Sequence, residues 1–167
     1  AMSPRATWVP VPEPDRVCEE LFSSAVDVVK LWQCQFVLLK DYVKSAKDRS
    51  QRFLKVDVDF DLAELCCDLV AARGRRFYRG VVLKEWRPLQ MYAGRGGPAP
   101  NEWRLFFCCG KLIAQLPNSF QDEKAASVPE KVSAWATAAA GRLGSPYLTI
   151  DVAEGVEEWF CLEAGDG

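Results

Sequence analysis

The residues that can carry chemistry in this chain are lysines, arginines and carboxylates, because its 167 residues include no histidine. Histidine is the usual general base near neutral pH and a common metal ligand, so its absence excludes Ser-His and Cys-His nucleophile pairs. The seven cysteines show no C-x-x-C spacing and are odd in number, which argues against a disulfide framework and a zinc knuckle. We therefore expect reduced thiols, a cytoplasmic protein and chemistry that depends on a bound cofactor.

Charge is distributed unevenly along the sequence, although the net charge is only −2. Basic residues gather in two stretches, 40–55 and 73–87, and residues 151–167 are acidic without any lysine or arginine. This distribution suits a polyphosphate that magnesium bridges to carboxylates. Composition alone leaves open an alternative to a phosphate site, in which these charged residues simply lie on solvent-exposed surfaces of different charge.

The first candidate site is a lysine-rich segment that follows an apolar run at residues 35–39. Lys40 ends the buried strand predicted there, and Lys44 and Lys47 follow in the next loop. Lysines in such a loop hold phosphates by charge, and the small residues between them let the backbone come close. The alternative is that these lysines simply face solvent.

The second candidate site flanks a glycine- and proline-rich stretch, residues 91–101, which we predict to be a mobile loop. Before it, a strand that ends at Glu85 and leads to Pro88 can act as a hinge whose backbone groups face a purine edge. After it, Glu102 and Arg104 share one strand face, and the planar arginine fork suits a phosphate or carboxylate. The alternative is a cross-strand ion pair at the surface, worth at most about 1 kcal/mol.

The third candidate site consists of two acidic residues near the end of the chain, Asp151 and Glu163, each beside an apolar strand. Burying either carboxylate without a partner would be costly. A short hairpin that brings the two together makes a hard-cation site of the kind that Mg²⁺ takes beside substrate phosphates.

The elements that must position these residues alternate between helices and strand pairs. Residues 1–14 are proline-rich and are expected to form an extended lead-in, and helices are predicted at 15–32, at 61–72 and from a capping box at 127–130. Strand pairs between helices indicate an α+β fold around a mainly antiparallel sheet. The sequence contains no G-x-G-x-x-G or Walker loop, and no apolar run of the roughly 20 residues that a membrane helix needs, so no membrane partner is expected.

In their order and spacing over residues 15–167, these segments resemble the ATP-grasp superfamily, and most of all the clade named for two arginines and a lysine. The motifs that carry the resemblance are LLKDYVKSAK, VVLKEWRPL, NEWRLFFCCGKLIA and TIDVAEGVEEWFCLEAGDG. The resemblance implies two α+β halves, about 15–75 and 76–167, with ATP between them.

The resemblance also implies roles for the motif residues. Two arginines are candidates for the catalytic ones, Arg87 and Arg104, with Arg79 as an alternative. The candidates for binding the nucleotide are Lys40, Lys44, Lys47, Lys84, Glu85, Trp86, Arg87 and Glu102. Asp151 and Glu163 would hold Mg²⁺. Gly165 stands where the family's E-x-N pattern has asparagine, so one metal ligand is either missing or supplied by Asp166.

The activity that the resemblance implies is Mg²⁺- and ATP-dependent ligation. A carboxylate-bearing small molecule or peptide becomes an acyl phosphate, which an amine or similar nucleophile attacks. One alternative is a nucleic-acid ligase or nucleotidyltransferase in which Lys40 is itself adenylylated, although the chain lacks the glycine expected after K-x-D. Another is a non-catalytic module that binds a nucleotide or a protein. We expect the family's preceding domain and closing helix to lie outside this chain, which can then bind ATP without turnover.

Overall fold

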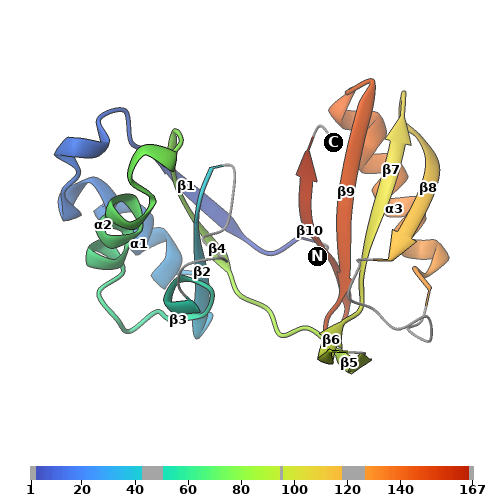
Figure 1. Cartoon of the computed structure of the whole chain (residues 1–167), viewed down its shortest axis with the longest axis horizontal. Helices are drawn as coiled ribbons and strands as arrows, with labels where there is room; N and C mark the ends of the chain where they lie inside the picture. The colour runs from blue at the N-terminus through green and yellow to red at the C-terminus, as the bar shows by residue number, and fades with distance from the viewer. Residues whose placement is uncertain (1–2, 43–50, 95, 118–126, 166–167) are drawn as a thin grey trace. The chain divides into compact units, whose positions relative to one another are not determined.

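The computed structural model describes residues 3–42, 51–94, 96–117 and 127–165. They form two compact α+β units, Pro4–Arg87 and the chain from Pro88 onward, which we call the first and second units (Figure 1). The predicted α+β class with antiparallel sheets is confirmed. The units divide after Arg87, whereas the resemblance implied a division at about residue 75. The strand at 80–85 belongs to the first unit because it pairs on both sides within that unit's sheet.

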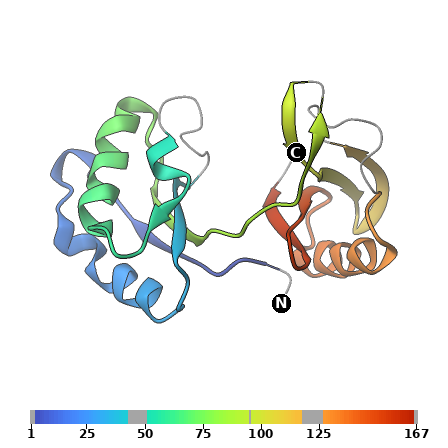
Figure 2. The ribbon, with the colours of Figure 1, turned by 90° about the horizontal axis from the view of Figure 1, so that it is seen from below.

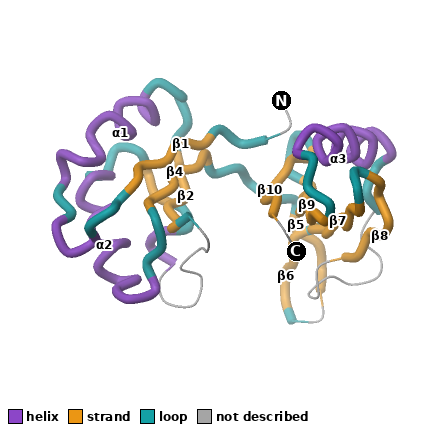
Figure 3. Tube along the Cα trace, turned by 90° about the horizontal axis from the view of Figure 1, so that it is seen from above, coloured by secondary structure: helices purple, strands orange, loops and turns teal. Residues whose placement is uncertain are grey.

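The first unit is built on a four-stranded antiparallel sheet in the order β1 (Ala6–Pro10), β4 (Gly80–Glu85), β2 (Phe36–Asp41) and β3 (Val56–Asp57). Two α-helices lie along one side of the sheet, α1 (Ser23–Lys30) and α2 (Leu62–Arg73) (Figure 3). Short 3-10 helices fill the connections at Pro14–Arg16, Glu19–Phe22, Gln51–Phe53 and Gly74–Arg76. Strand side chains alternate between the two sheet faces, and those facing the helices form the core: Val9, Val37, Leu39, Val81 and Leu83.

Helix α2 begins and ends as the sequence predicts. The Asp61 carboxylate accepts hydrogen bonds from the backbone N–H groups of Ala63 and Glu64, both at 3.1 Å, which satisfies two donors of the first turn. Gly74, with a φ of +48°, ends the helix in a conformation that favours glycine. Burial raises the pKa of Cys66 on the buried side of this helix to about 12, and all seven cysteines are free thiols.

Two predictions for the start of the chain are wrong. The expected helix at 15–32 is an α-helix only over α1, because Val17 and Cys18 have extended backbone angles that interrupt it. The expected lead-in contains β1, which pairs along its whole length with β4. Its position at the edge of the sheet explains how a proline-rich segment can be a strand, since an edge strand needs fewer backbone donors.

The second unit has a four-stranded antiparallel sheet in the order β10 (Trp159–Gly165), β9 (Tyr147–Glu154), β7 (Glu102–Cys108) and β8 (Lys111–Pro117). Helix α3 (Glu130–Leu143) packs along one face, as Figure 2 shows at the right. The core between sheet and helix includes Leu105, Phe107, Val132, Ala136, Ile150 and Val152. The capping box predicted at residues 127–130 is wrong, because Pro129 is the N-cap residue and no side chain caps the helix.

The stretch predicted to be a mobile loop is instead a hairpin of β5 (Met91–Gly94) and β6 (Gly97–Pro100). A hydrogen-bond network attaches its ends to the main sheet of the second unit. The Tyr92 hydroxyl and the Asn101 amide both donate to the Glu154 carboxylate at 2.8 Å, and the Trp103 indole donates to Asn101 at 2.8 Å. The local sequence did not reveal these partners because Glu154 lies more than 50 residues further along the chain.

Two glycines of the second unit offer a matched test of this packing. A Cβ added at Gly155 would lie 2.7 Å from both the Glu158 carbonyl oxygen and the buried Phe160 ring, whereas one added at Gly141 in α3 meets nothing within 4 Å. We expect Gly155→Ala to lower the free energy of unfolding by about 1–3 kcal/mol through overpacking. Gly141→Ala should raise it by about 0.5–1 kcal/mol, because alanine is the better helix former. Urea unfolding followed by circular dichroism measures both changes, and equal effects would contradict the packing described.

Candidate functional site

Three charged residues predicted for the site form one row across the sheet of the second unit. Arg104 of β7 lies directly opposite Asp151 of β9, and Asp151 lies directly opposite Glu163 of β10. Residues directly opposite each other in antiparallel strands project from the same face. That face is the one turned away from α3, because Leu105 and Ile150, the next residues along two of these strands, are buried in the core with the helix.

A β-bulge in β10 brings Glu163 into this row. Cys161 is opposite Val152, so a regular register would place Leu162 opposite Asp151; the shift between Cys161 and Glu163 places the glutamate there instead. An extra residue in one strand changes the sheet face from which the following side chains project. The row therefore depends on the bulge, which is not visible as a sequence pattern.

Arg104 binds the Asp151 carboxylate with two parallel hydrogen bonds. The Nε–Oδ1 and Nη2–Oδ2 distances are both 2.7 Å. Hydrogen bonding to Asp151 raises the pKa of the Arg104 guanidinium above its ordinary value, and the charges of Asp151 and Glu163 raise it further. Bidentate geometry makes this pair stronger than most exposed ion pairs, although the Arg104 side chain is 55% exposed and solvent screens the pair.

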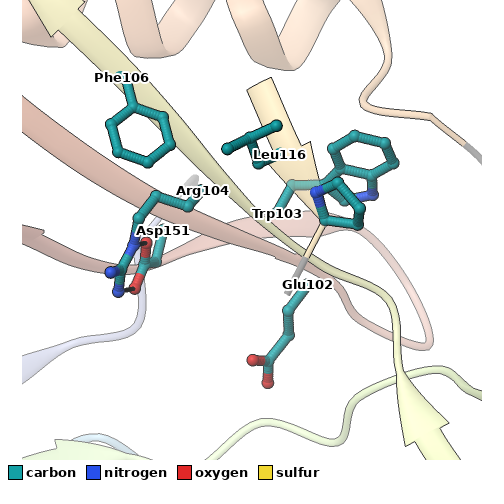
Figure 4. A pocket seen from close by; sticks show the side chains of 7 residues that line it. Glu102, Trp103, Arg104, Phe106, Leu116 and Asp151 are labelled. Carbon is teal, nitrogen blue, oxygen red and sulfur yellow. Dashed lines mark hydrogen bonds and ion pairs between the residues drawn. The ribbon is translucent and has the colours of Figure 1, made fainter. Parts of the chain in front are cut away.

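A cavity of about 260 Å³ lies beside the Arg104–Asp151 pair, over β7 and β8 (Figure 4). It is lined by Glu102, Trp103, Arg104, Phe106, Leu116, Pro117 and Asp151. In Figure 4 the Glu102 carboxylate lies apart from the ion pair, while Phe106 and Leu116 provide apolar walls. The sequence indicated Glu102 and Arg104 as site residues but not the apolar members, because single hydrophobic residues in strands give no sign that they line a cavity.

The facing carboxylates of Asp151 and Glu163 fit the requirements of a magnesium site. Mg²⁺ in nucleotide sites is held by one or two carboxylates together with phosphate oxygens and water, so a third protein carboxylate is not required. No cluster of three or more potential metal ligands occurs among the residues that the structure describes. Asp166, the predicted replacement ligand, lies outside those residues. The Thr149 hydroxyl donates to the Gly165 carbonyl at 3.2 Å and so fixes the strand end beside Asp166.

In the first unit, Lys40 and Lys84 project from the same face of the sheet. Lys40 of β2 is opposite Val82 of β4, and Lys84 is opposite Leu38, two pairs further along. Both lysines alternate with buried core residues, so they lie on the face turned away from α1 and α2. Lys44 and Lys47 lie outside the described residues. The structure thus brings two of the four predicted lysines onto a single sheet face.

An aromatic pair continues this face of the first unit. The rings of Phe36 and Trp86 pack edge to face with centroids 5.8 Å apart. The Lys55 ammonium lies 4.2 Å from the Phe36 centroid and 4.4 Å from that of Trp86, which is close enough for attraction to both rings. Lys55 belongs to the basic stretch at 40–55, but nothing in the local sequence shows that it contacts Trp86.

Glu85 lies on the other face, where two arginines hold its carboxylate. The backbone N–H and the Nε of Arg5 donate to one oxygen at 3.1 Å, and the Arg5 Nη2 donates to the other at 3.3 Å. The Arg87 guanidinium is 3.5 Å away. Partial burial alone would raise the pKa of Glu85, but the hydrogen bonds from Arg5 and the charge of Arg87 outweigh it and lower the pKa. This arrangement shows Glu85 joining β1 to β4, while its predicted role in binding nucleotide remains a prediction.

The lowered pKa of Glu85 gives a pH test. Because the folded pKa lies below the ordinary value of 4.5, the stabilisation is fully present above that pH and is lost as pH falls through the folded pKa. We expect Glu85→Gln to cost about 1–3 kcal/mol in the free energy of unfolding at neutral pH, since charged donors lose their acceptor. The cost should shrink as pH falls below about 4. Urea titrations at several pH values measure this dependence.

Glu13→Gln is the matched control, because Glu13 also pairs with an arginine, Arg16, but at an exposed position. It should leave the free energy of unfolding nearly unchanged. A pH dependence that is identical in Glu85→Gln and in the unchanged protein would contradict this account of the carboxylate.

Comparison with known proteins shows the family and the fold of this chain. The family profile for ATP-grasp domains of family 3 in the clade named for two arginines and a lysine matches residues 27–167. Over 99% of its length the chain is similar to three solved structures, each at 17% identity: the ATP-grasp ligase PsnB complexed with precursor peptide PsnA2 and AMPPNP (TM-score 0.56), Cdc123 from Schizosaccharomyces pombe (0.60), and an ATP-grasp RimK domain protein from Sphaerobacter thermophilus (0.57).

These likenesses show a shared fold. The chain spans 44% of the PsnB chain, 78% of Cdc123 and 52% of the RimK domain protein. No curated protein sequence matches it.

Proposed function

Since the chain belongs to family 3 of the ATP-grasp clade named for two arginines and a lysine, we propose that it binds ATP with Mg²⁺ and activates a carboxylate for ligation to an amine or similar nucleophile. The observation that carries the proposal is the row of Arg104, Asp151 and Glu163 on the open face of the second unit's sheet. Such a row provides two acidic metal ligands beside one guanidinium. Two structures of PsnB contain Mg and ADP, which supports this assignment by fold.

The lysines of the first unit would hold the phosphates of ATP. Lys40 and Lys84 present two positive charges on one sheet face, and Lys44 and Lys47 follow Lys40 in the chain. An ammonium on a flexible stem binds phosphate oxygens as a point charge. Trp86 on the same face would contribute an aromatic surface for the base, with Lys55 at its ring.

Asp151 and Glu163 would hold Mg²⁺, which supplies charge neutralisation at the phosphates when bound. Asp151 has both oxygens on Arg104, so it must release at least one hydrogen bond in order to bind a metal ion. The guanidinium that is set free would be available for a phosphate or a substrate carboxylate, the anions that its planar fork fits. Arg104 thus acts as the internal counter-ion of Asp151 before the nucleotide binds.

In the proposed reaction ATP is a substrate. An oxygen of the substrate carboxylate forms a bond to the γ-phosphorus while the bond from that phosphorus to the bridging oxygen breaks, which releases ADP. The nucleophile then forms a bond to the carbonyl carbon, the carbon–oxygen bond to phosphate breaks, and phosphate leaves. The amine proton goes to solvent. The chain's own contribution is to position charged groups, which needs no histidine.

Calorimetric titration with AMPPNP and Mg²⁺ tests the nucleotide site. We expect saturable binding that weakens about tenfold or more in Lys40→Ala, because a charged hydrogen bond to phosphate contributes about 1.5–3 kcal/mol. Lys30→Ala is the matched control, since Lys30 is exposed at the last position of α1. Equal weakening in both variants, or unchanged binding in Lys40→Ala, would contradict the site.

Mass spectrometry after incubation with ATP separates the alternatives. The proposed ligase leaves the protein unmodified and yields ADP when a substrate is present. An adenylylated Lys40 would show a nucleotidyltransferase instead, and binding without any ADP formation across carboxylate and amine substrates would show a non-catalytic module.

A further inference from the structure

We propose that the edge strand β1 and the apolar groove beside it form a docking surface for an extended peptide segment that carries an acidic side chain. The groove lies within the first unit and has a volume of about 570 Å³. It is lined mainly by Trp8, Pro10, Pro12, Phe77, Tyr78 and Arg79. None of the described lysines and carboxylates assigned to ATP and Mg²⁺ lines it, so the inference goes beyond the proposed function and does not depend on it.

The backbone of β1 offers hydrogen-bonding groups at the edge of the sheet. The Val11 N–H donates to the Arg79 carbonyl oxygen at 2.9 Å, one residue beyond the end of the paired strands. In an antiparallel pair, residues that bond to the partner strand alternate with residues whose N–H and C=O groups point the other way. The backbone groups of Ala6 and Trp8 therefore point away from β4, and both residues are exposed. An extended peptide can pair with such an edge as an added strand.

Proline limits how far that pairing extends. Pro10 takes the next outward-facing position after Trp8, and it has no N–H to donate. Pairing to backbone donors therefore ends at Trp8, and a peptide that continues past this residue lies over the groove. The exposed rings of Trp8 and Tyr78 offer apolar surface there, which an apolar side chain of the peptide would cover.

The charge of the groove favours a carboxylate. Arg79 is the one charged residue in the described lining, and no carboxylate among the described residues forms an ion pair with it. Its guanidinium carbon lies 5.0 Å from the Tyr78 ring centroid and 5.9 Å from that of Tyr42. These rings carry no net charge, so they attract the guanidinium without neutralising it. Glu13, in the segment along one side of the groove, pairs instead with Arg16 at 3.2 Å.

The surroundings of Arg79 favour a side-chain carboxylate over the carboxylate at the end of a peptide. A terminal carboxylate is usually captured by several backbone N–H groups together. Prolines at positions 10, 12 and 14 provide no such donors, and the N–H of Val11 already donates to Arg79. A planar guanidinium holds a carboxylate side chain through two parallel hydrogen bonds without backbone help. We therefore assign this position to an aspartate or glutamate of the peptide.

The test uses two peptides with capped ends, in which threonine alternates with valine before a final phenylalanine and glutamate. In the second peptide, lysine replaces the glutamate. Each is titrated into the protein while nuclear magnetic resonance follows the amides of Ala6 and Trp8 and the Trp8 indole. We expect saturable shifts with the glutamate peptide and at least about fivefold weaker binding of the lysine peptide, because a hydrogen bond between charged groups is lost.

Two variants separate the charge from the strand edge. Arg79→Gly removes the guanidinium at a φ of +65°, which glycine adopts without strain, so folding is not at risk. It should bind both peptides equally weakly, whereas the control Arg75→Gly, at an exposed position outside the groove lining, should behave as the unchanged protein does. Ala6→Pro removes one outward-facing donor and should weaken both peptides by a similar factor.

Three results would overturn the inference. The first is the absence of saturable shifts at Ala6 and Trp8 with the glutamate peptide. The second is equal affinity for the glutamate and lysine peptides in the unchanged protein. The third is binding as tight by a peptide that has glutamine in place of glutamate and a free terminal carboxylate, which would show that the groove takes peptide ends instead of acidic side chains.

Discussion

The register of the antiparallel strands β7, β9 and β10 is the constraint on which the candidate site depends. Strand side chains alternate with a period of two, so a shift of one residue would move Asp151 or Glu163 from the open face into the core. The bulge after Cys161 sets this register on β10, and the direct opposition of Arg104 and Asp151 sets it on β7. Ionised groups are strongly disfavoured in an apolar core, so the charges themselves help to select the register.

In the first unit, the same alternation of strand side chains places lysines and a carboxylate on opposite faces of the sheet. Lys40 and Lys84 project from the open face of its sheet, and Glu85, the residue after Lys84, therefore projects from the other. There its carboxylate joins β1 to β4 through Arg5. Strand β1 lies at the edge of the sheet and pairs with β4 on one side, so this side-chain attachment adds to that pairing. Neighbouring residues of one motif would thus serve the proposed nucleotide binding on one face, while Glu85 joins two strands on the other.

The sequence predicted those parts of the fold that rest on local signals. The apolar run of β2, the strands that hold Arg104 and Asp151, and the helix α2 are all readable from a few adjacent residues. The hairpin at 91–100 was not predicted, because its glycines and prolines are typical of loops and its attachment comes from the distant Glu154. Likewise, β1 is a strand only because it can pair with β4.

The candidate site was predictable in part for the same reason. Residue types and order indicated Lys40, Arg104, Asp151 and Glu163, and alternation placed Glu102 beside Arg104 on one face. The contact of Arg104 with Asp151 and the apolar walls of the cavity arise because strands that are distant in the sequence pair with one another. The position of Glu163 opposite Asp151 arises from an irregularity in strand pairing, the bulge in β10. No local pattern contains that information.

Paramagnetic relaxation by Mn²⁺, used in place of Mg²⁺ with AMPPNP, tests the central claim most directly, because it locates the metal ion without any need for turnover. The account predicts that substoichiometric Mn²⁺ broadens the amide signals around Asp151 and Glu163 first, only when the nucleotide is present, and that Asp151→Asn with Glu163→Gln abolishes the effect. Broadening that centres on the exposed Glu157 and Glu158, or that persists in the double variant, would contradict it.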